Sequence, residues 1–385
     1  ERVGKTPSTL RLILPESCLE GPNVETDIME INNTMTRYLR ENRFVEYPHS
    51  MIYVERAMTS GRTRRGLVGM VDLERYDYEP GSGAMVRATE GTVLSRIPPR
   101  VAVRKNAPIE LPHIMLLSDD PEKTVIEPLA GQTGGMELLY DFELMEGGGH
   151  IRGWKLTQEQ LEQVEQALVA LADPVAFRER YALKDAFPVM LFAAGDGNHS
   201  LATAKECYER QKKLFPPEQW ASLPARYALV ELNNLHDDSL EFEPIHRVVF
   251  GADPEELLDA LAAFYPGSSR TDRPEGHRLA WVARGQEGTV SVPQPSAQLP
   301  VGTLQHFLDE YLLSHPGARV DYIHGEDVVR SLAAQPDTVG FLLPAMGKEE
   351  LFPTVIHDGV LPRKTFSMGE AHDKRFYLEA RRIRV

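Results

Sequence analysis

The segment Gly195–Ser200, with the sequence GDGNHS, holds the residues of this chain that are best suited to chemistry. A short apolar run precedes it and a helix-like stretch follows it, which predicts a turn between a strand and a helix. The first N–H groups of a helix lack intrahelical acceptors and the helix dipole adds positive potential, so this turn suits an anion. Gly195 and Gly197 would let a phosphate approach the backbone closely. His199 and Ser200 could donate hydrogen bonds to its oxygens.

Asp196 and Asn198 complete this turn. Asp196 is placed to hold Mg²⁺ or to bind a hydroxyl group, and Asn198 joins the expected phosphate-binding residues. The turn lacks the GK[ST] of a phosphate-binding P-loop. It half matches the dinucleotide pattern GxGxxG, because Ser200 replaces the third glycine and no acid ends a second strand about 20 residues later. A purely structural turn is the open alternative.

Two further groups of residues could bind an anion. His246 and Arg247 end a polar loop before an apolar strand. Arg363, Lys364 and Thr365 follow a proline in a constrained loop, where two cations and a hydroxyl could grip a phosphate or carboxylate. The last 25 residues hold seven basic and three acidic side chains, although a solvated basic surface explains most such runs.

Glu90 lies in the segment VRATEGT, beside a glycine and two threonines, and is the candidate general base or metal ligand. The 12 histidines form no HExxH pairing, and the chain has no GxSxG elbow. These absences argue against a zinc enzyme and a serine hydrolase.

The elements that must position these residues predict an α+β, or mixed α/β, fold. Two hairpins are expected in the N-terminal half: one joins strands at 51–55 and 66–71, and the other lies in 136–156. Thr157 and Gln160 form a capping-box pattern before a helix. We expect a β-rich region over residues 1–250 and a smaller αβ region over 251–385.

Composition limits the classes of function. The chain has 385 residues and a net charge of −15, which argues against unselective binding to nucleic acid or anionic membranes. Two cysteines are too few for a disulfide scaffold or a four-cysteine zinc site. No apolar run approaches the roughly 20 residues that span a bilayer. We therefore expect a cytoplasmic protein that binds a small molecule and neither nucleic acid nor membrane, and that could form a homo-oligomer.

Seven segments, in order, resemble the bacterial and archaeal family named for domain of unknown function 1015, over roughly residues 50–385. They are GLVGMVDLERYD (66–77), VRATEGT (86–92), GDGNHSLATA (195–204), EPIHRVV (243–249), VDYIHG (320–325), GFLLP (340–344) and LPRKTF (361–366). The family signature Asp-Gly-His-His-Arg is kept at Asp196, Gly197 and His199, whereas Asn198 and Ser200 replace the first histidine and the arginine.

The resemblance implies a ParB/sulfiredoxin-like strand-turn-helix element around residues 188–214, in a group that includes free serine kinases. It implies a small-molecule enzyme, such as a kinase-like phosphotransferase, that binds a nucleotide or phosphorylated metabolite and acts on serine or a similar hydroxylated compound. Asp196 would hold Mg²⁺ with ATP, ADP or CTP, and Glu90, Asp196 and His199 would be catalytic. Ser200 stands where the family signature has an arginine, and this difference argues against kinase activity. Lys364 or Arg247 could replace the missing charge. The alternative is a binding protein that responds to a nucleotide or metabolite without turnover.

Overall fold

The computed structural model describes residues 6–19, 21–184, 187–368 and 374–384, and it has the α+β fold that the sequence predicts. The contacts divide the chain into a first unit, Glu1–Leu240 with Ala371–Val385, and a second unit, Glu241–Glu370. The sequence analysis expected a division after residue 250, and those two domains remain a prediction. Each unit is described by itself below.

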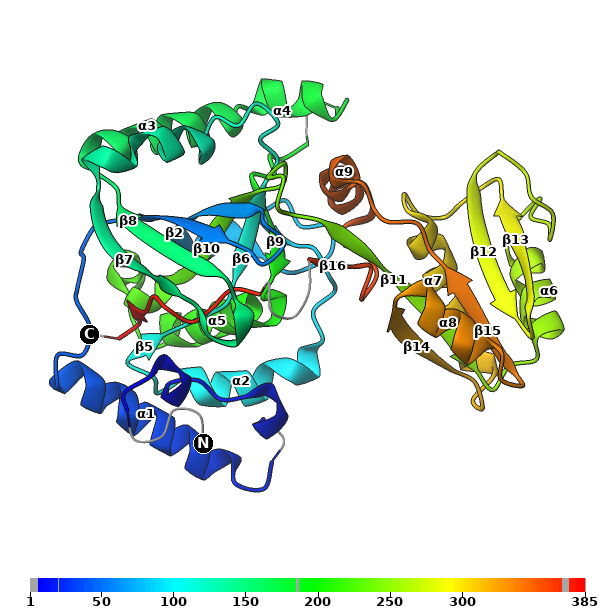
Figure 1. Ribbon diagram of the computed structural model, residues 1–385, viewed down its shortest axis with the longest axis horizontal. Coiled ribbons are helices and arrows are strands. Elements are labelled where there is room, and N and C mark those ends of the chain that lie inside the picture. Colours follow the sequence, from blue (N-terminus) through cyan, green and yellow to red (C-terminus); the bar gives the residue numbers. More distant parts are fainter. Residues whose placement is uncertain (1–5, 20, 185–186, 369–373, 385) are drawn as a thin grey trace. The chain divides into compact units, whose positions relative to one another are not determined.

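The first unit is built on a mixed sheet, whose strands are coloured blue to green in Figure 1. Across the sheet, the described strands are β3 (Tyr76–Asp77), β4 (Val86–Ala88), β9 (Phe192–Asp196), β6 (Met115–Ser118), β10 (Tyr227–Asn234), β2 (Thr63–Asp72), β1 (Ile52–Ala57), β8 (His150–Lys155) and β7 (Glu137–Glu143). A separate two-stranded sheet joins β5 (Ile109–Glu110) to β17 (Arg381–Arg382). The C-terminal residues therefore belong to the first unit.

Strand direction decides where the loops of this sheet meet. β4 and β9 are parallel neighbours, with Ala88 opposite Ala194. Their carboxyl ends therefore lie at one edge of the sheet, where Asp196 ends β9 and Glu90 lies two residues after β4. β6 runs antiparallel to β9 and parallel to β10, so the carboxyl ends of β6 and β10 meet at the opposite edge.

The helices of the first unit bury apolar stripes against the sheet or against each other. They are α1 (Val24–Arg40), α2 (Ile97–Arg104), α3 (Gln158–Leu171), α4 (Pro174–Arg180) and α5 (Asn198–Lys212). Short 3₁₀ segments lie at η1 (Thr9–Arg11), η2 (Glu16–Cys18), η3 (Leu73–Arg75), η4 (Leu94–Arg96), η5 (Glu127–Gly135), η6 (Met145–Gly147), η7 (Pro217–Ser222) and η8 (Pro224–Arg226). The capping box at Thr157 and Gln160 is confirmed, since each side chain accepts a hydrogen bond from the other's backbone N–H.

The two faces of the sheet are covered differently. One face holds the main core, in which Tyr53 and Leu67 pack with Val164 of α3 and Leu201 of α5. The other face carries a smaller cluster around Val54 and Val68, which Phe376 and Leu378 of the C-terminal segment cover. The C-terminal segment thus replaces a helix as the cover of this face.

The second unit has its own sheet and helices. Its described strands run in the order β13 (Gln286–Val292), β12 (His277–Ala283), β15 (Thr338–Leu342), β11 (Phe242–Phe250) and β14 (Arg319–His324), with β16 (Phe366–Met368) paired to the start of β11. Its helices are α6 (Pro254–Phe264), α7 (Pro300–Ser314), α8 (Glu326–Ala333) and α9 (Lys348–Asp358). Val329 and Ala333 of α8 pack on Val248 and Val282 of the sheet.

Both predicted hairpins are confirmed as the antiparallel pairs β1–β2 and β7–β8. Other boundaries differ. The helix expected over 30–43 spans Val24–Arg40, and the strand expected over 188–194 spans Phe192–Asp196. His246 and Arg247, expected in a loop, lie inside β11, because hydrogen bonds to Gln305 and to main-chain groups satisfy both buried polar side chains.

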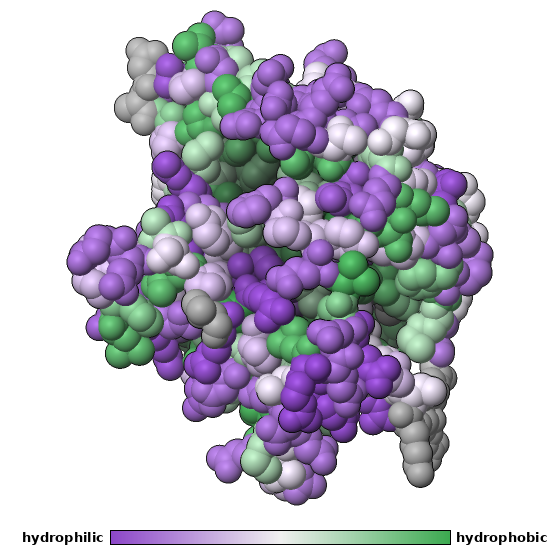
Figure 2. Space-filling view, turned by 90° about the vertical axis from the view of Figure 1, so that its left-hand side faces the viewer, coloured by the Kyte–Doolittle hydropathy of each residue, from purple (hydrophilic) through white to green (hydrophobic). Residues whose placement is uncertain are grey.

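Among the described residues, no helix combines the length and apolarity needed to cross a membrane. The face in Figure 2 shows hydrophobic residues in small separate groups among hydrophilic ones.

Gly197 is the residue on which the β9–α5 turn depends, and replacing it tests this. Its φ is 79°, and an added Cβ would lie 2.9 Å from the Cα of Ile114. The left-handed conformation costs an L-residue about 1–2 kcal/mol, so we expect Gly197→Ala to lower the free energy of unfolding by at least that amount. Urea unfolding followed by tryptophan fluorescence measures the loss.

Gly131→Ala is the matched control, because no atom lies within 4 Å of its added Cβ and its φ is not left-handed. Equal stability of the two variants would contradict the steric argument.

Candidate functional site

The loop after β4 and the turn before α5 are tied together by buried hydrogen bonds. The Thr89 N–H donates to Asn198 Oδ1 at 3.2 Å, and the Thr89 hydroxyl donates to the Ala194 carbonyl at 2.6 Å. The Asn198 amide also donates to that carbonyl, at 3.1 Å. Asn198 is 8% exposed, so its side chain positions the turn, and its backbone N–H is the group left to face a ligand.

His199 lies in the first turn of α5 and is held from the same loop. Its Nε2 accepts a hydrogen bond from the Val93 N–H at 3.3 Å. An imidazole nitrogen that accepts is unprotonated, so the neutral ring carries its proton on Nδ1. His199 and Ser200 are both half-buried. The predicted donor role of His199 therefore belongs to Nδ1.

Gly195 and Asp196 are the last residues of β9, and Gly197 connects them to α5 at the sheet edge where Glu90 also lies. The Gly197 N–H donates to Asp196 Oδ1 at 2.8 Å, and Lys374 Nζ lies 3.1 Å from Asp196 Oδ2. One carboxylate therefore receives an amide donor and an ammonium group. The structure places Glu90, directly after Thr89, at the same sheet edge as the predicted residues of 195–200, and it adds Lys374.

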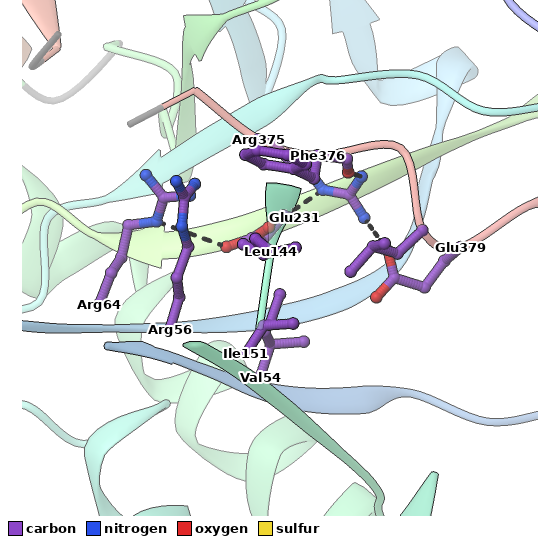
Figure 3. Close-up of a pocket in the computed structure, with 10 residues that line it drawn as sticks. Val54, Arg56, Arg64, Leu144, Ile151, Glu231, Arg375, Phe376 and Glu379 are labelled. Carbon is purple, nitrogen blue, oxygen red and sulfur yellow. Dashed lines mark hydrogen bonds and ion pairs between the residues drawn. The ribbon is translucent and has the colours of Figure 1, made fainter. Parts of the chain in front are cut away.

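Lys374 is followed by an arginine that anchors the C-terminal segment in a small cavity (Figure 3). Arg375 is 5% exposed, and its guanidinium lies 3.0 Å from Glu231 and 2.5 Å from Glu379. Burial disfavours its charge, but Glu379 and Glu231 outweigh that effect and raise the pKa of Arg375. Arg56, stacked over Phe376, donates to the Lys374 carbonyl at 2.7 Å.

Most basic side chains of the C-terminal run therefore bind partners within the first unit. Arg381 pairs with Glu110 at 2.9 Å and donates to main-chain carbonyls, and Arg382 pairs with Glu46 at 3.1 Å. The alternative of a solvated basic surface does not describe Arg381, which is 16% exposed, but it does describe Arg382, whose pair with Glu46 is exposed. Two acids of the run, Glu370 and Asp373, lie outside the described residues.

The other predicted cations come together within the second unit. Arg247 is fully buried and donates to the carbonyls of Ile245, Lys364 and Arg363 at 2.7, 2.9 and 2.8 Å. The Thr365 hydroxyl closes the loop by donating to the Pro362 carbonyl at 2.7 Å. Arg247 therefore fixes the loop of Arg363–Thr365, and it can reach a ligand only if that loop moves.

Arg363 and Lys364 are exposed on this loop. Lys364 has a φ of 58°, a left-handed value that a lysine adopts at a cost. Arg363 lies over the Tyr322 ring at 5.6 Å, and Arg247 lies over the same ring at 4.6 Å. The loop therefore presents two cations in a fixed conformation.

His246 is buried beside Arg247 and accepts a hydrogen bond from the Leu343 N–H at its Nδ1, at 3.0 Å. Burial lowers the pKa of His246, so the ring is neutral at pH 7. This hydrogen bond joins β11 to Leu343, so His246 stabilises the sheet of the second unit.

A polar cluster that the sequence analysis missed lies at the opposite edge of the first sheet. His236 Nε2 lies 2.6 Å from Asp119 Oδ1, and the Tyr181 hydroxyl donates to Asp119 Oδ2. Burial opposes the charge of Asp119, but these two hydrogen bonds lower its pKa overall. Arg180 donates to the Asp119 carbonyl, so the cluster attaches α4 to the sheet. Its signal in the sequence was polar residues directly after two apolar runs.

Within the described residues, no group of three or more His, Cys, Asp or Glu side chains is arranged to hold a metal ion. Mg²⁺ commonly takes only one or two protein carboxylates and completes its shell with water and substrate phosphates. Asp196 fits that role only when its pairing with Lys374 is relaxed.

The fold and the sheet-edge turn thus define an α+β protein with a candidate site for an anionic small molecule. The profile of the family described as Protein of unknown function (DUF1015) matches residues 1–311, and the chain belongs to that family. No curated protein matches it.

Several solved structures are similar to this chain at a low level. A free serine kinase in complex with AMP is 12% identical, with a TM-score of 0.42, over 82% of this chain and 91% of that chain. SbnI with a C-terminal truncation, from Staphylococcus aureus, is 12% identical, with a TM-score of 0.41, over 82% and 87%. A conserved hypothetical protein from Pyrococcus furiosus is 11% identical, with a TM-score of 0.39, over 82% and 95%. Likeness at this level does not identify a function.

The buried neutral histidines predict that the second unit loses stability in mild acid. Burial lowers the pKa of both His246 and His277. The unfolded chain takes up these protons near pH 6.5, whereas the folded chain does so only at lower pH, so stability falls as pH drops below that value. We expect a slope of up to about 1.4 kcal/mol per pH unit for each group. Urea unfolding between pH 5 and 8, followed at Trp281, measures it.

His246→Asn, which keeps an acceptor for the Leu343 N–H, should reduce this slope. His357→Gln replaces an exposed histidine of α9 and serves as the control. A slope that neither substitution changes would contradict the assignment to His246.

Proposed function

We propose that the chain binds a nucleotide or another small phosphorylated metabolite at the sheet edge formed by residues 89–93 and 195–200. The observation that carries this proposal is the meeting of the parallel β4 and β9 carboxyl ends at a left-handed glycine turn into the 15-residue helix α5. Ligands of sheets with parallel strands bind outside the carboxyl ends of those strands. The chemistry of the turn selects an anion.

The backbone supplies the first part of the anion affinity. The N-terminus of a helix carries roughly half a positive charge on its unsatisfied N–H groups. The first residues of α5 are Asn198, His199 and Ser200, so the positive end of its dipole lies at the turn, and Gly195 and Gly197 add no side chain that would keep a phosphate away. The Ser200 hydroxyl and His199 Nδ1 are the side-chain donors that we assign to the phosphate.

As an enzyme, the protein would transfer a phosphoryl group to a hydroxylated metabolite, for which the sequence resemblance suggests serine. The bond between the transferred phosphorus and the nucleotide breaks, a bond from the acceptor oxygen to that phosphorus forms, and the acceptor's proton goes to the Glu90 carboxylate. The shortened nucleotide leaves as an anion. Positioning and charge neutralisation supply most of the catalysis in such reactions.

Asp196 would hold Mg²⁺ together with phosphate oxygens and water, and bound Mg²⁺ would neutralise charge that develops on the phosphates. The exposed Arg363 and Lys364 of the second unit are proposed as cations for the same class of ligand. His246 and Arg247 contribute by holding the strand and the loop that carry them.

A second candidate function is ligand binding without turnover. The ion pair of Asp196 with Lys374 favours it, because a carboxylate neutralised by an ammonium group attracts a divalent cation less strongly. A binding protein predicts affinity without product, and assembly that depends on the ligand. A homo-oligomer and a cytoplasmic location remain expectations.

Calorimetric titration of ATP, ADP and CTP, each with and without Mg²⁺, tests the proposed ligand class. We expect at least one to bind, and Ser200→Asp to weaken it by about 10-fold or more, because the new carboxylate would face the phosphate. Ser222→Asp, on a 3₁₀ segment away from the turn, is the control. A folded protein that binds none of the three nucleotides would disprove the proposal.

Glu90→Gln separates the enzyme from the binding protein. Loss of the base should reduce transfer of labelled phosphate to serine by about 10²–10⁴-fold, while nucleotide affinity stays within about threefold. No transfer by the wild-type chain, with nucleotide affinity intact, would favour the binding protein.

A further inference from the structure

We propose that Lys374 binds the anionic group of the ligand at the sheet edge, and that buried Arg375 positions it there. This inference rests on the proposed function and names a residue outside the motifs in which the sequence analysis placed the site. It is carried by three observations: the position of the ammonium group, the anchoring of its backbone, and the freedom of its side chain.

The ammonium group already takes part in binding an oxyanion. Lys374 Nζ lies 3.1 Å from one oxygen of the Asp196 carboxylate, and the Gly197 N–H donates to the other oxygen at 2.8 Å. An ammonium and a backbone amide that converge on one carboxylate are the donors that also bind a phosphate. Lys374 can therefore reach an anion placed against the first turn of α5.

The backbone at this position is fixed by buried groups. Arg56 donates to the Lys374 carbonyl at 2.7 Å, from a side chain that is 2% exposed. The next residue, Arg375, lies between Glu231 and Glu379 (Figure 3). It also donates to the carbonyl of Pro112 at 3.2 Å. Breaking this network would leave buried charges unpaired, which is strongly destabilising. The network therefore holds the Cα of Lys374 at the turn.

The side chain itself remains adjustable. It is 41% exposed, and a partly exposed ion pair contributes little to stability. The four-carbon stem can therefore exchange the carboxylate for a phosphate at small cost while its backbone stays in place. Loss of this cation would also leave the Asp196 charge uncompensated beside the ligand, so its removal should weaken binding twice over.

The local sequence offers no cation in the first turn of α5. The nearest one, Lys205, donates to the Leu73 carbonyl and pairs with Glu209, so it faces away from the turn. In the described part of the chain, the structure records an ion pair between a basic side chain and residues 195–200 at Lys374, which pairs with Asp196. Its ammonium group supplies positive charge to this turn, where Ser200 replaces the arginine of the family signature.

Titrations of four proteins test the inference: wild type, Lys374→Met, Lys374→Arg and Lys123→Met. The probes are the tightest-binding of ATP, ADP and CTP and its parent nucleoside, without Mg²⁺. Lys123 is the matched control, because its side chain is also 41% exposed and pairs with an aspartate, Asp238, near the opposite edge of the sheet.

We expect Lys374→Met to weaken the nucleotide about 10-fold or more and to leave the nucleoside unchanged, since a hydrogen bond to a charged group contributes about 1.5–3 kcal/mol. Lys374→Arg should retain affinity within about threefold, and Lys123→Met should match wild type. Equal nucleotide affinity of Lys374→Met and Lys123→Met would overturn the inference and leave the proposed function intact. Failure of the wild type to bind any of the three nucleotides would remove both.

The double variant Asp196→Asn with Lys374→Met distinguishes contact from simple neutralisation. If Lys374 contacts the anionic group, the double variant still binds the nucleotide more weakly than Asp196→Asn alone. If Lys374 only cancels the Asp196 charge, these two proteins bind equally, which would overturn the proposed contact. Thermal unfolding midpoints equal to that of Lys123→Met would show that the variants are folded.

Discussion

The first unit depends on the burial of Arg375 between Glu231 and Glu379. This charge network attaches the C-terminal segment to a sheet face that would otherwise expose Val54 and Val68 to water. Burying charges in this way adds little stability compared with an apolar core, but removing one partner is costly. The network therefore mainly determines which residue of the segment lies beside the β9–α5 turn.

Both units use buried arginines in the same way. In the first unit, Arg56 donates to the carbonyl of Lys374, and in the second, Arg247 donates to the carbonyl of Lys364. In each case a guanidinium hidden from solvent binds the main chain of a lysine whose own side chain reaches the surface. Arginine suits this role because its planar fork reaches several carbonyls at once and keeps its charge when buried.

The sequence predicted the class of fold and the local elements well where the signal is local. The capping box at Thr157 and the two N-terminal hairpins are set by residues close together in the chain, and all three are present. The Gly197 turn was likewise predicted, because a glycine between an apolar run and a helix has few other uses. The pairing of β4 with β9, which places Glu90 at the same edge as Asp196, depends on residues about 100 positions apart and on strand direction, so periodicity could not reveal it.

The candidate site was harder to predict for the same reason. A cluster of cations in the sequence does not show which of them bind carbonyls inside the fold, and Arg247 and Arg381 both do. Lys374 could not be distinguished from its basic neighbours by residue type. Only the buried contacts of Arg375 show where its side chain lies.

The chain leaves the first unit after Leu240 and returns to it only with the C-terminal segment. The second unit is continuous in sequence, so all of its strands have been synthesised before the ribosome reaches Arg375. The first unit, in contrast, lacks Arg375, Arg381 and Ile383 until the whole second unit has been synthesised, and its sheet face is not covered before then. During synthesis the apolar surface around Val54 and Val68 is therefore open while 130 further residues of another unit are made, and this is the interval in which the growing chain most needs protection from aggregation.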